Sequence, residues 1–161
     1  MNAPLAAALP DPDATDALAR ALAPLMRAGD AVLLEGPVGA GKTAFARALI
    51  GALRAEAGLP PEGVPSPTFT LVQTYDTGAF ETWHADLYRL SDPDEVVELG
   101  LDEAFQTALA LVEWPDRLGA AAPAGALTVT LQQTGETGRV LTLTGPAETL
   151  ARLAPAFGPA S

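Results

Sequence analysis

The stretch that most constrains this chain is residues 36–43, Gly-Pro-Val-Gly-Ala-Gly-Lys-Thr. It fits the phosphate-binding loop pattern, in which a glycine is followed by four residues and then by Gly-Lys-Thr. The apolar, partly β-branched segment 31–35 precedes it and predicts a buried strand. Residues 43–57 follow it, with Phe45, Leu49 and Leu53 four apart, and predict a helix that buries one stripe. The sequence therefore predicts a strand, a loop and a helix in the order that this pattern requires.

The residue types in this loop suit the binding of a phosphate. Glycines let backbone N–H groups curl round the anion without Cβ clashes, and the following helix adds the positive end of its dipole. Lys42 can reach the β- and γ-phosphates of a nucleotide, and the Thr43 hydroxyl can bind Mg²⁺. Lys42 is also the only lysine among the nine basic residues of the chain. The sequence thus keeps a compact ammonium at the one position where the pattern needs it.

A second predicted strand, residues 109–113, ends in an acidic residue. Its apolar run stops at Glu113, and Pro115 prevents the strand from continuing. Proteins with a phosphate-binding loop use an acid at such a strand end to complete a Mg²⁺ site. We therefore predict Glu113 as a metal-binding and catalytic residue, and the alternative is a strand-end acid on the surface. Trp114 is predicted to pack over the site or to offer an aromatic surface to a partner.

Between these two landmarks lies a predicted hairpin with further candidate residues. Residues 81–88 alternate, which puts Thr82, His84 and Asp86 on one face of a strand. Asp86 is predicted to orient an attacking water or to hold Mg²⁺ through water, and the alternative is a pair with Arg89. His84 is the sole histidine and is interpreted as a structural hydrogen-bonding residue rather than a catalyst.

The segment around residues 66–68, before this hairpin, has two possible interpretations. Ser66-Pro67-Thr68 leads into a predicted strand in the second half of residues 64–75. Ser66 and Thr68 could form a switch segment that senses a γ-phosphate or Mg²⁺. The alternative is an ordinary strand start that proline stiffens.

Composition narrows the class of protein. A chain of 161 residues predicts a single domain, residues 1–161. The absence of cysteine excludes disulfides and thiolate metal sites and is compatible with a cytoplasmic protein. No apolar run approaches 18 residues, so we expect no transmembrane helix. The net charge of −11 argues against a broad basic surface for DNA or RNA.

The remaining elements follow from caps, breakers and alternation. The expected elements are a weak strand at 4–9, a helix from Asp11 or Asp13 to about Arg27, a helix from Ser91 or Asp92 to Gly100, a short helix or turn at 101–106, a linker at 120–125, a hairpin over 126–144 and a short helix at 146–153. Residues 1–9 and the tail from Pro155 to Ser161 are expected to fray.

Taken together, the motifs resemble one family. The loop at 36–43 is followed by Ser-Pro-Thr-Phe-Thr-Leu-Val at 66–72, His-Ala-Asp-Leu-Tyr-Arg-Leu at 84–90 and Val-Glu-Trp-Pro at 112–115. Their order and spacing resemble TsaE, the small ATPase of bacterial threonylcarbamoyladenosine biosynthesis, over about residues 10–145. The resemblance implies a three-layer α/β fold of the P-loop NTPase type, with a mixed central sheet flanked by helices. It also implies ATP and Mg²⁺ as cofactors and weak ATP hydrolysis by the protein alone.

The resemblance further assigns residues and partners. It implies catalytic roles for Lys42, Asp86 and Glu113, and Mg²⁺ binding by Thr43 and Glu113. The residues expected at the nucleotide are Thr15, Gly36, Gly39, Ala40, Gly41, Lys42, Thr43, Ala44, Ser66, Thr68, Trp114 and Arg139. The implied partner is the TsaB–TsaD pair, which modifies the adenosine next to the anticodon of tRNA, so contact with tRNA is expected to be indirect.

Two other functions remain compatible with these residues. A small-molecule kinase of the P-loop class would share the loop, but such kinases close an arginine-bearing lid over the phosphates, and the eight arginines here are scattered. A nucleotide-gated binding module would share the site and use hydrolysis only incidentally.

Overall fold

The computed structural model describes residues 4–37, 39–64, 71–90, 92 and 94–158. Ser66 and Thr68, the candidate switch residues, lie outside this part of the chain, and so does Ser91, one of the two predicted helix caps.

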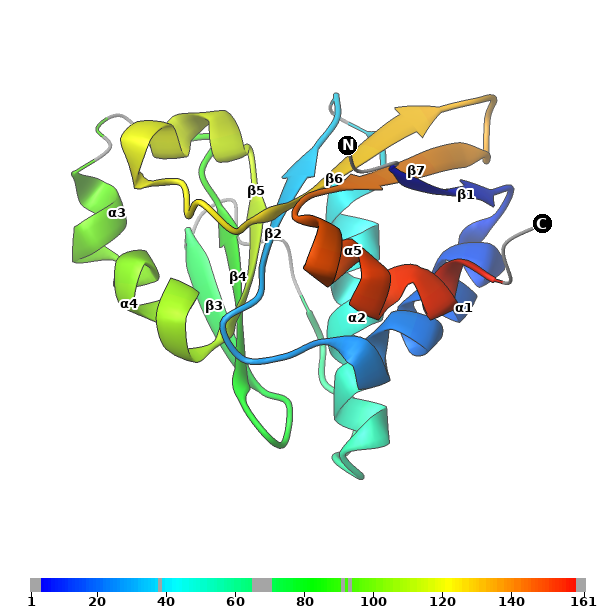
Figure 1. Cartoon of the computed structure of the whole chain (residues 1–161), viewed down its shortest axis with the longest axis horizontal. Coiled ribbons are helices and arrows are strands. Elements are labelled where there is room, and N and C mark those ends of the chain that lie inside the picture. Colours follow the sequence, from blue (N-terminus) through cyan, green and yellow to red (C-terminus); the bar gives the residue numbers. More distant parts are fainter. Residues whose placement is uncertain (1–3, 38, 65–70, 91, 93, 159–161) are drawn as a thin grey trace.

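A seven-stranded mixed sheet forms the middle layer of the described chain (Figure 1). The strand order is β1-β7-β6-β2-β5-β4-β3. The four central strands β6, β2, β5 and β4 run parallel, while β7, β1 and β3 pair antiparallel at the two sides. The strands are β1 Leu5–Leu9, β2 Ala31–Glu35, β3 Val72–Asp76, β4 Glu81–Asp86, β5 Leu109–Glu113, β6 Leu127–Gln133 and β7 Arg139–Thr144.

Helices cover both faces of this sheet. Helices α1, α2 and α5 lie against one face, and α3 and α4 lie against the other, on the left in Figure 1. The α-helices are α1 Pro12–Leu22, α2 Lys42–Glu56, α3 Glu95–Glu98, α4 Leu101–Thr107 and α5 Ala147–Leu153. In the described ranges, three 3₁₀ helices extend or connect them: η1 Ala23–Leu25, η2 Pro115–Ala121 and η3 Ala154–Phe157. The prediction of a three-layer α/β fold with a mixed central sheet is confirmed.

Strand alternation divides the apolar residues between two cores. In β5, Leu109 and Leu111 join the core under α1 and α2, while Ala110 and Val112 join the core under α3 and α4. Every residue of β5 is buried, which is why its sequence reads as a continuous apolar run. Glu113 follows Leu111 by two residues and therefore faces the α2 side of the sheet.

The parallel strands bring three separate segments to one edge of the sheet. Strand β5 pairs with β2 on one side, with Leu34 opposite Glu113, and with β4 on the other, with Asp86 opposite Glu113. The carboxyl ends of β2, β4 and β5 therefore lie next to one another. In open α/β sheets this is the edge at which ligands bind.

Two helices are shorter than the sequence predicted. Helix α1 begins at the predicted cap, where the Asp11 side chain accepts from the Ala14 amide at 2.9 Å, but it ends at Leu22. Pro24 lacks an amide hydrogen, so the chain continues as the 3₁₀ helix η1 rather than as α-helix to Arg27. The expected helix up to Gly100 is reduced to the single turn of α3.

Segments near both ends of the described chain form regular structure. The weak strand expected at 4–9 is the edge strand β1, paired with β7 along its whole length. Of the tail expected to fray from Pro155 to Ser161, the described residues up to Phe157 lie in η3, and Ala156 and Phe157 pack against the core. The linker expected at 120–125 starts later, because η2 extends to Ala121. Within the described ranges, no helix is both long enough and apolar enough to cross a lipid bilayer.

Candidate functional site

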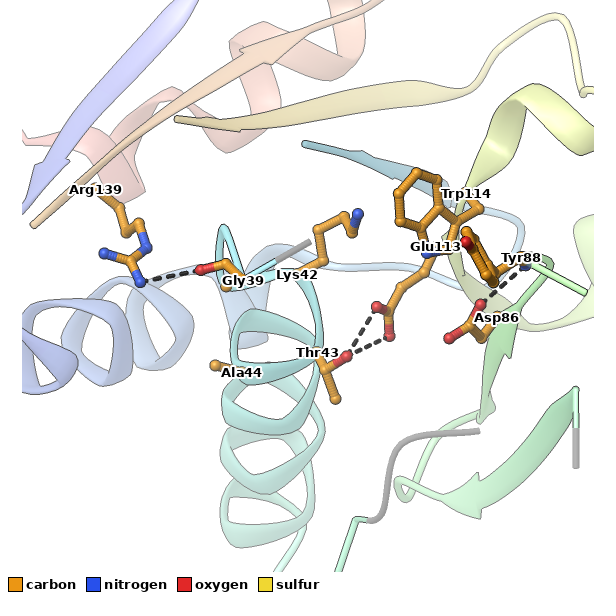
Figure 2. Close-up of a pocket in the computed structure, with 10 residues that line it drawn as sticks. Gly39, Lys42, Thr43, Ala44, Asp86, Tyr88, Glu113, Trp114 and Arg139 are labelled. Carbon is orange, nitrogen blue, oxygen red and sulfur yellow. Dashed lines mark hydrogen bonds between the residues drawn. The ribbon is translucent and has the colours of Figure 1, made fainter. Parts of the chain in front are cut away.

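A cleft of about 540 Å³ opens at the carboxyl ends of β2, β4 and β5 (Figure 2). Its floor is the amino-terminal turn of α2 together with Gly39 and Gly41 of the preceding glycine-rich loop. Its wall comes from the ends of β4 and β5 and from the start of β7. The lining residues are Gly39, Gly41, Lys42, Thr43, Ala44, Asp86, Tyr88, Glu113, Trp114 and Arg139.

Backbone geometry explains why glycines occupy the loop. Gly36, Gly39 and Gly41 all have positive φ angles, of 151°, 83° and 103°, which L residues rarely adopt. A Cβ at Gly36 would also lie 2.7 Å from the carbonyl oxygen of Leu131 on the neighbouring strand β6. The loop can therefore turn from β2 into α2 in so few residues only with glycine at these places.

The Lys42 ammonium lies inside the site rather than in solvent. Its Nζ donates to the carbonyl oxygen of Gly36 and lies 3.6 Å from the centre of the Trp114 ring. Only 6% of the Lys42 surface is exposed. Burial lowers the pKa of Lys42 below its ordinary value, and the carboxylates of Glu113, Asp86 and Asp116 partly offset this effect.

Trp114 reaches Lys42 through an unusual backbone conformation. Its φ and ψ are 59° and 55°, in the left-handed region, which costs an L residue about 1–2 kcal/mol. This turn ends β5 and brings the indole back over the cleft, where it also packs against Tyr88 at a ring-centre distance of 5.0 Å. Backbone strain of this kind is concentrated at functional sites.

Thr43 and Glu113 form the polar centre of the site. The Thr43 hydroxyl lies 2.8 and 3.0 Å from the two carboxylate oxygens of Glu113 (Figure 2). Glu113 is 2% exposed, and its Oε2 also accepts a hydrogen bond from His84 Nε2 at 2.7 Å. Asp86, beside Glu113 on β4, is 5% exposed, and its Oδ1 accepts the Tyr88 amide at 3.0 Å.

Arg139 reaches the loop from the far side of the cleft. Its Nε donates to the carbonyl of Ala40 at 3.0 Å. Its Nη2 donates to the carbonyl of Gly39 at 3.1 Å, which Figure 2 shows. A guanidinium can hold two consecutive carbonyls in this way because its donors are fixed in one plane. Arg139 therefore ties the start of β7 to the loop.

A smaller cavity of about 140 Å³ lies behind the loop, between the start of α1 and the end of the β6–β7 hairpin. Thr15, Ala40, Gly41 and Arg139 are among its lining residues, and Gly41, Ala44 and Arg139 line both cavities. Thr15, which lies far from the loop in sequence, is thus placed beside it.

Comparison with known proteins identifies the family of this chain. The family model described as "Threonylcarbamoyl adenosine biosynthesis protein TsaE" matches residues 9–141. The chain belongs to the TsaE family. That region holds all the residues that line the cleft.

Individual TsaE proteins support this assignment. The chain is 38% identical to a TsaE protein of Rickettsia bellii over 130 residues, 81% of this chain and 88% of that protein. It is 35% identical to the TsaE protein of Bacillus subtilis over 83% of this chain and 81% of that protein. A match to the Rickettsia felis TsaE is 45% identical but covers 63% of this chain and only 57% of that protein.

A solved structure supports the fold. The crystal structure of Bacillus subtilis YdiB matches with a TM-score of 0.77 and 28% sequence identity. The match covers 98% of this chain and 95% of that one.

In this TsaE-family chain most of the predicted site residues come together. Lys42, Thr43, Asp86, Glu113 and Trp114 line one cleft, with Arg139, Gly39, Gly41 and Ala44 at its side. Gly36 contributes its carbonyl to Lys42 rather than facing the cleft, and Ala40 is buried behind the loop. The sequence interpretation did not include Tyr88, which follows Asp86 by two residues in the turn after β4 and is 51% exposed. Strand alternation could not have indicated it, because β4 ends at Asp86.

The chemistry of the site suits an anion together with a hard cation. Backbone amides at the start of α2 and the Lys42 ammonium can hold a phosphate. Hydroxyl and carboxylate oxygens of Thr43, Glu113 and Asp86 are the donor types that Mg²⁺ prefers. Within the part of the chain that the structure describes, no three His, Cys, Asp or Glu side chains converge to hold a metal by themselves. A Mg²⁺ ion here would therefore need oxygens from a bound phosphate and from water, which is its usual arrangement in phosphate sites.

Proposed function

We propose that this TsaE-family protein binds and hydrolyses ATP with Mg²⁺, and that it supports a TsaB–TsaD complex in the threonylcarbamoyladenosine modification of tRNA. The family's role in tRNA threonylcarbamoyladenosine biosynthesis supports our proposal of a cytoplasmic location. We further propose that tRNA is contacted through the partners rather than directly.

One observation carries this proposal. Lys42, Thr43 and Glu113 meet at the amino-terminal turn of α2, in a cleft of about 540 Å³, although they come from segments some seventy residues apart. The pattern of residues 36–43 predicts a phosphate-binding loop, and the strand, the loop and the helix around it have the arrangement that such a loop requires. The Thr43–Glu113 contact supports a place for Mg²⁺ where the sequence predicted one.

Each side chain then has a role that its position supports. The loop amides and Lys42 hold the phosphates and stabilise the charge that develops on the transferring group. Mg²⁺, when bound, neutralises charge on the β- and γ-phosphate oxygens. Thr43 and Glu113 hold that ion, and Asp86, beside Glu113 at the next strand end, orients the attacking water. Trp114 covers the Lys42 side of the site.

The smaller cavity behind the loop is the proposed place of the base and ribose. It lies next to the loop and contains Thr15 and Arg139, which the family resemblance puts near the nucleotide. Selectivity between ATP and GTP would then depend on the start of α1 and the β6–β7 hairpin.

Hydrolysis by the protein alone should be slow. Lys42 and Arg139 are the only cations among the described residues that line the cleft, and Arg139 is engaged with loop carbonyls. An arginine supplied by a partner accelerates related nucleotide hydrolases by about 10³–10⁵-fold. The same shortage of arginines disfavours a kinase, which needs cations over the phosphates.

The decisive experiment measures ATP hydrolysis by the purified protein, alone and with a bacterial TsaB–TsaD pair. Lys42→Ala serves as the blank, and its thermal unfolding is recorded to check that it is folded. We expect slow hydrolysis alone and stimulation by the pair that disappears in Lys42→Ala. ATP binding without any stimulation would contradict the proposed partnership and would call for a screen of phosphoryl acceptors.

A second variant separates energy coupling from nucleotide-gated binding. Asp86→Asn keeps the size of the side chain but removes the charge that orients water, so it should bind ATP and hydrolyse it poorly. We expect this variant to fail to support repeated tRNA modification by the pair. Support through many turnovers would mean that the bound state alone is sufficient.

A further inference from the structure

His84 is a buried polar residue whose position next to the site has no assigned role. It lies on β4 with no exposed surface, and its backbone is opposite Leu111 of the parallel strand β5. Residues opposite each other on neighbouring parallel strands point to the same face of the sheet, so His84 faces the α2 side together with Glu113. The imidazole therefore lies beneath the carboxylate, away from the cleft.

The contact between the two residues defines how His84 is used. Its Nε2 is 2.7 Å from Glu113 Oε2, and a carboxylate can only accept, so Nε2 carries the hydrogen. The other ring nitrogen, Nδ1, is buried and has no hydrogen-bond partner among the described residues. Among the described residues, the His84 ring therefore makes its hydrogen bond to Glu113 alone.

This bond differs in kind from the bond that Thr43 makes to the same carboxylate. The Thr43 hydroxyl lines the cleft and can rotate toward a ligand, whereas His84 is enclosed by the sheet and the helix layer. When Thr43 turns to a bound cation, the hydrogen bond from His84 to Glu113 can remain. Groups that hold a metal-binding side chain from behind in this way commonly affect metal affinity or activity by 10–100-fold.

We propose that His84 is a positioning residue, which fixes the Glu113 carboxylate in the orientation needed to hold Mg²⁺ together with Thr43. The inference rests on the proposed function, because it concerns the same site. It departs from the sequence interpretation of His84 as a structural residue only. A structural residue would affect folding, whereas a positioning residue also affects how the protein responds to Mg²⁺.

The test compares His84→Gln with His84→Asn, two polar substitutions whose side chains differ in length. The amide nitrogen of a glutamine can occupy nearly the position of Nε2 and donate to Glu113, whereas an asparagine is too short. The matched control is Thr82→Val on the same face of β4, which removes a buried hydrogen bond to Thr77 of 2.9 Å without touching Glu113. ATP affinity is measured by calorimetry across a Mg²⁺ series and in EDTA, and thermal unfolding is recorded for every variant.

We expect His84→Asn to raise the Mg²⁺ concentration that half-saturates the gain in ATP affinity by about 10–100-fold. His84→Gln should restore most of the wild-type value of this Mg²⁺ concentration, and Thr82→Val should leave it unchanged. The ATP affinity in EDTA should be the same for all variants. If His84→Asn does not fold, His84→Leu fills much of the same space without a donor and takes its place.

Two results would overturn the inference. One is a folded His84→Asn or His84→Leu with the wild-type Mg²⁺ requirement, and the other is an equal shift in Thr82→Val. A wild-type protein whose ATP affinity does not respond to Mg²⁺ would instead overturn the proposed function, and the role of His84 would fall with it.

Discussion

Lys42 holds a positive charge in a place that water hardly reaches. Its ammonium is held between the Gly36 carbonyl and the Trp114 ring, and burial outweighs the attraction of the nearby carboxylates, so its pKa is lowered. A charged group that is less favourable in the folded state than in the unfolded one reduces stability. Lys42, to which we assign the proposed phosphate contact, therefore destabilises the ligand-free protein.

This predicts a pH dependence that belongs to Lys42 alone. Below its lowered pKa, Lys42 is protonated in both states and the loss of stability is complete. Between that pKa and the ordinary value of 10.5, the unfolded state binds the proton more strongly, so stability rises with pH. Urea unfolding at a series of pH values should therefore show that the unfolding free energy of the wild type rises relative to that of Lys42→Met as the pH approaches 10.5.

Because Lys42 is the only lysine, the comparison isolates one amine, and tyrosine ionisation cancels between the two proteins. A difference in unfolding free energy that stays constant with pH would show that the ammonium is not desolvated.

Arg139 allows a prediction about the shape of the loop. A lysine keeps the charge but cannot donate to the carbonyls of Gly39 and Ala40 at the same time. We expect Arg139→Lys to weaken the binding of ATP and of ADP by the same factor, about tenfold for one charged hydrogen bond lost. Calorimetric titration with both nucleotides checks this, and a loss confined to ATP would mean that Arg139 acts on the γ-phosphate instead.

At the scale of single residues, some contacts could be predicted from the sequence and others could not. That Lys42, Thr43 and Glu113 lie together could be predicted, because each stands at the start of the helix or at the strand end that borders the cleft. The contact between His84 and Glu113 could not, because it depends on the register between two strands whose residues are 29 apart in sequence. Likewise, nothing local to Arg139 indicates that its guanidinium ends on loop carbonyls about 100 residues away.

Among the elements, the transition from β2 into α2 is the most tightly constrained. Gly36 lies against the backbone of β6, whereas a Cβ at Gly39 would meet nothing within 4 Å. Both glycines have positive φ angles, so the two positions share the conformational penalty and differ in the space available.

We therefore expect Gly36→Ala and Gly39→Ala to differ in stability. Gly39→Ala should reduce the unfolding free energy by about 1–2 kcal/mol, the cost of a left-handed L residue. Gly36→Ala should lose about 1–3 kcal/mol more, because the new methyl group forces the loop away from the Leu131 carbonyl. Denaturant unfolding of both variants measures the difference. Equal losses of unfolding free energy would show that β6 moves to accommodate the methyl group at no cost.

The elements themselves were predicted best where the pattern was long or strongly alternating. The strands at 31–35 and 109–113 and the hairpin over 126–144 fall where the sequence predicted them. The errors occur where a single residue decides, as at Pro24, or where tertiary packing orders a segment without a strong local preference. The 3₁₀ helix η3 is of the second kind, since the apolar contacts of Phe157 with the core hold it in place.

Over the whole molecule, the carboxyl-terminal region is part of the core although it lies beyond the family match. Leu150 and Leu153 of α5 are buried against the same core as α1 and α2. Arg152 ties this helix to the start of β2 through two hydrogen bonds to Asp30, of 2.7 and 3.0 Å, and a third to the Leu25 carbonyl. The matched region 9–141 therefore depends on a segment outside it for its stability.

Removing this tie should be far more destabilising than removing a surface pair. Arg152→Met leaves Asp30, whose side chain is 12% exposed, without its main partner, so we expect a loss of about 2–4 kcal/mol. Arg117→Met is the matched control, because the contact of Arg117 with Asp116 is 3.9 Å long and exposed, and such pairs contribute about 0–1 kcal/mol. Thermal unfolding of both variants provides the measurement, and similar melting temperatures would refute the structural role of Arg152.

The order of the strands also determines when the site can assemble while the chain is being translated. The site needs the loop that follows β2, the ends of β4 and β5, and finally Arg139 at the start of β7. A growing chain therefore makes its glycine-rich loop early but cannot assemble the cleft around it until Arg139, about 100 residues later, has been synthesised. Until then the loop lacks both Arg139 and Glu113, so the nucleotide binding proposed above has to wait for the synthesis of β7.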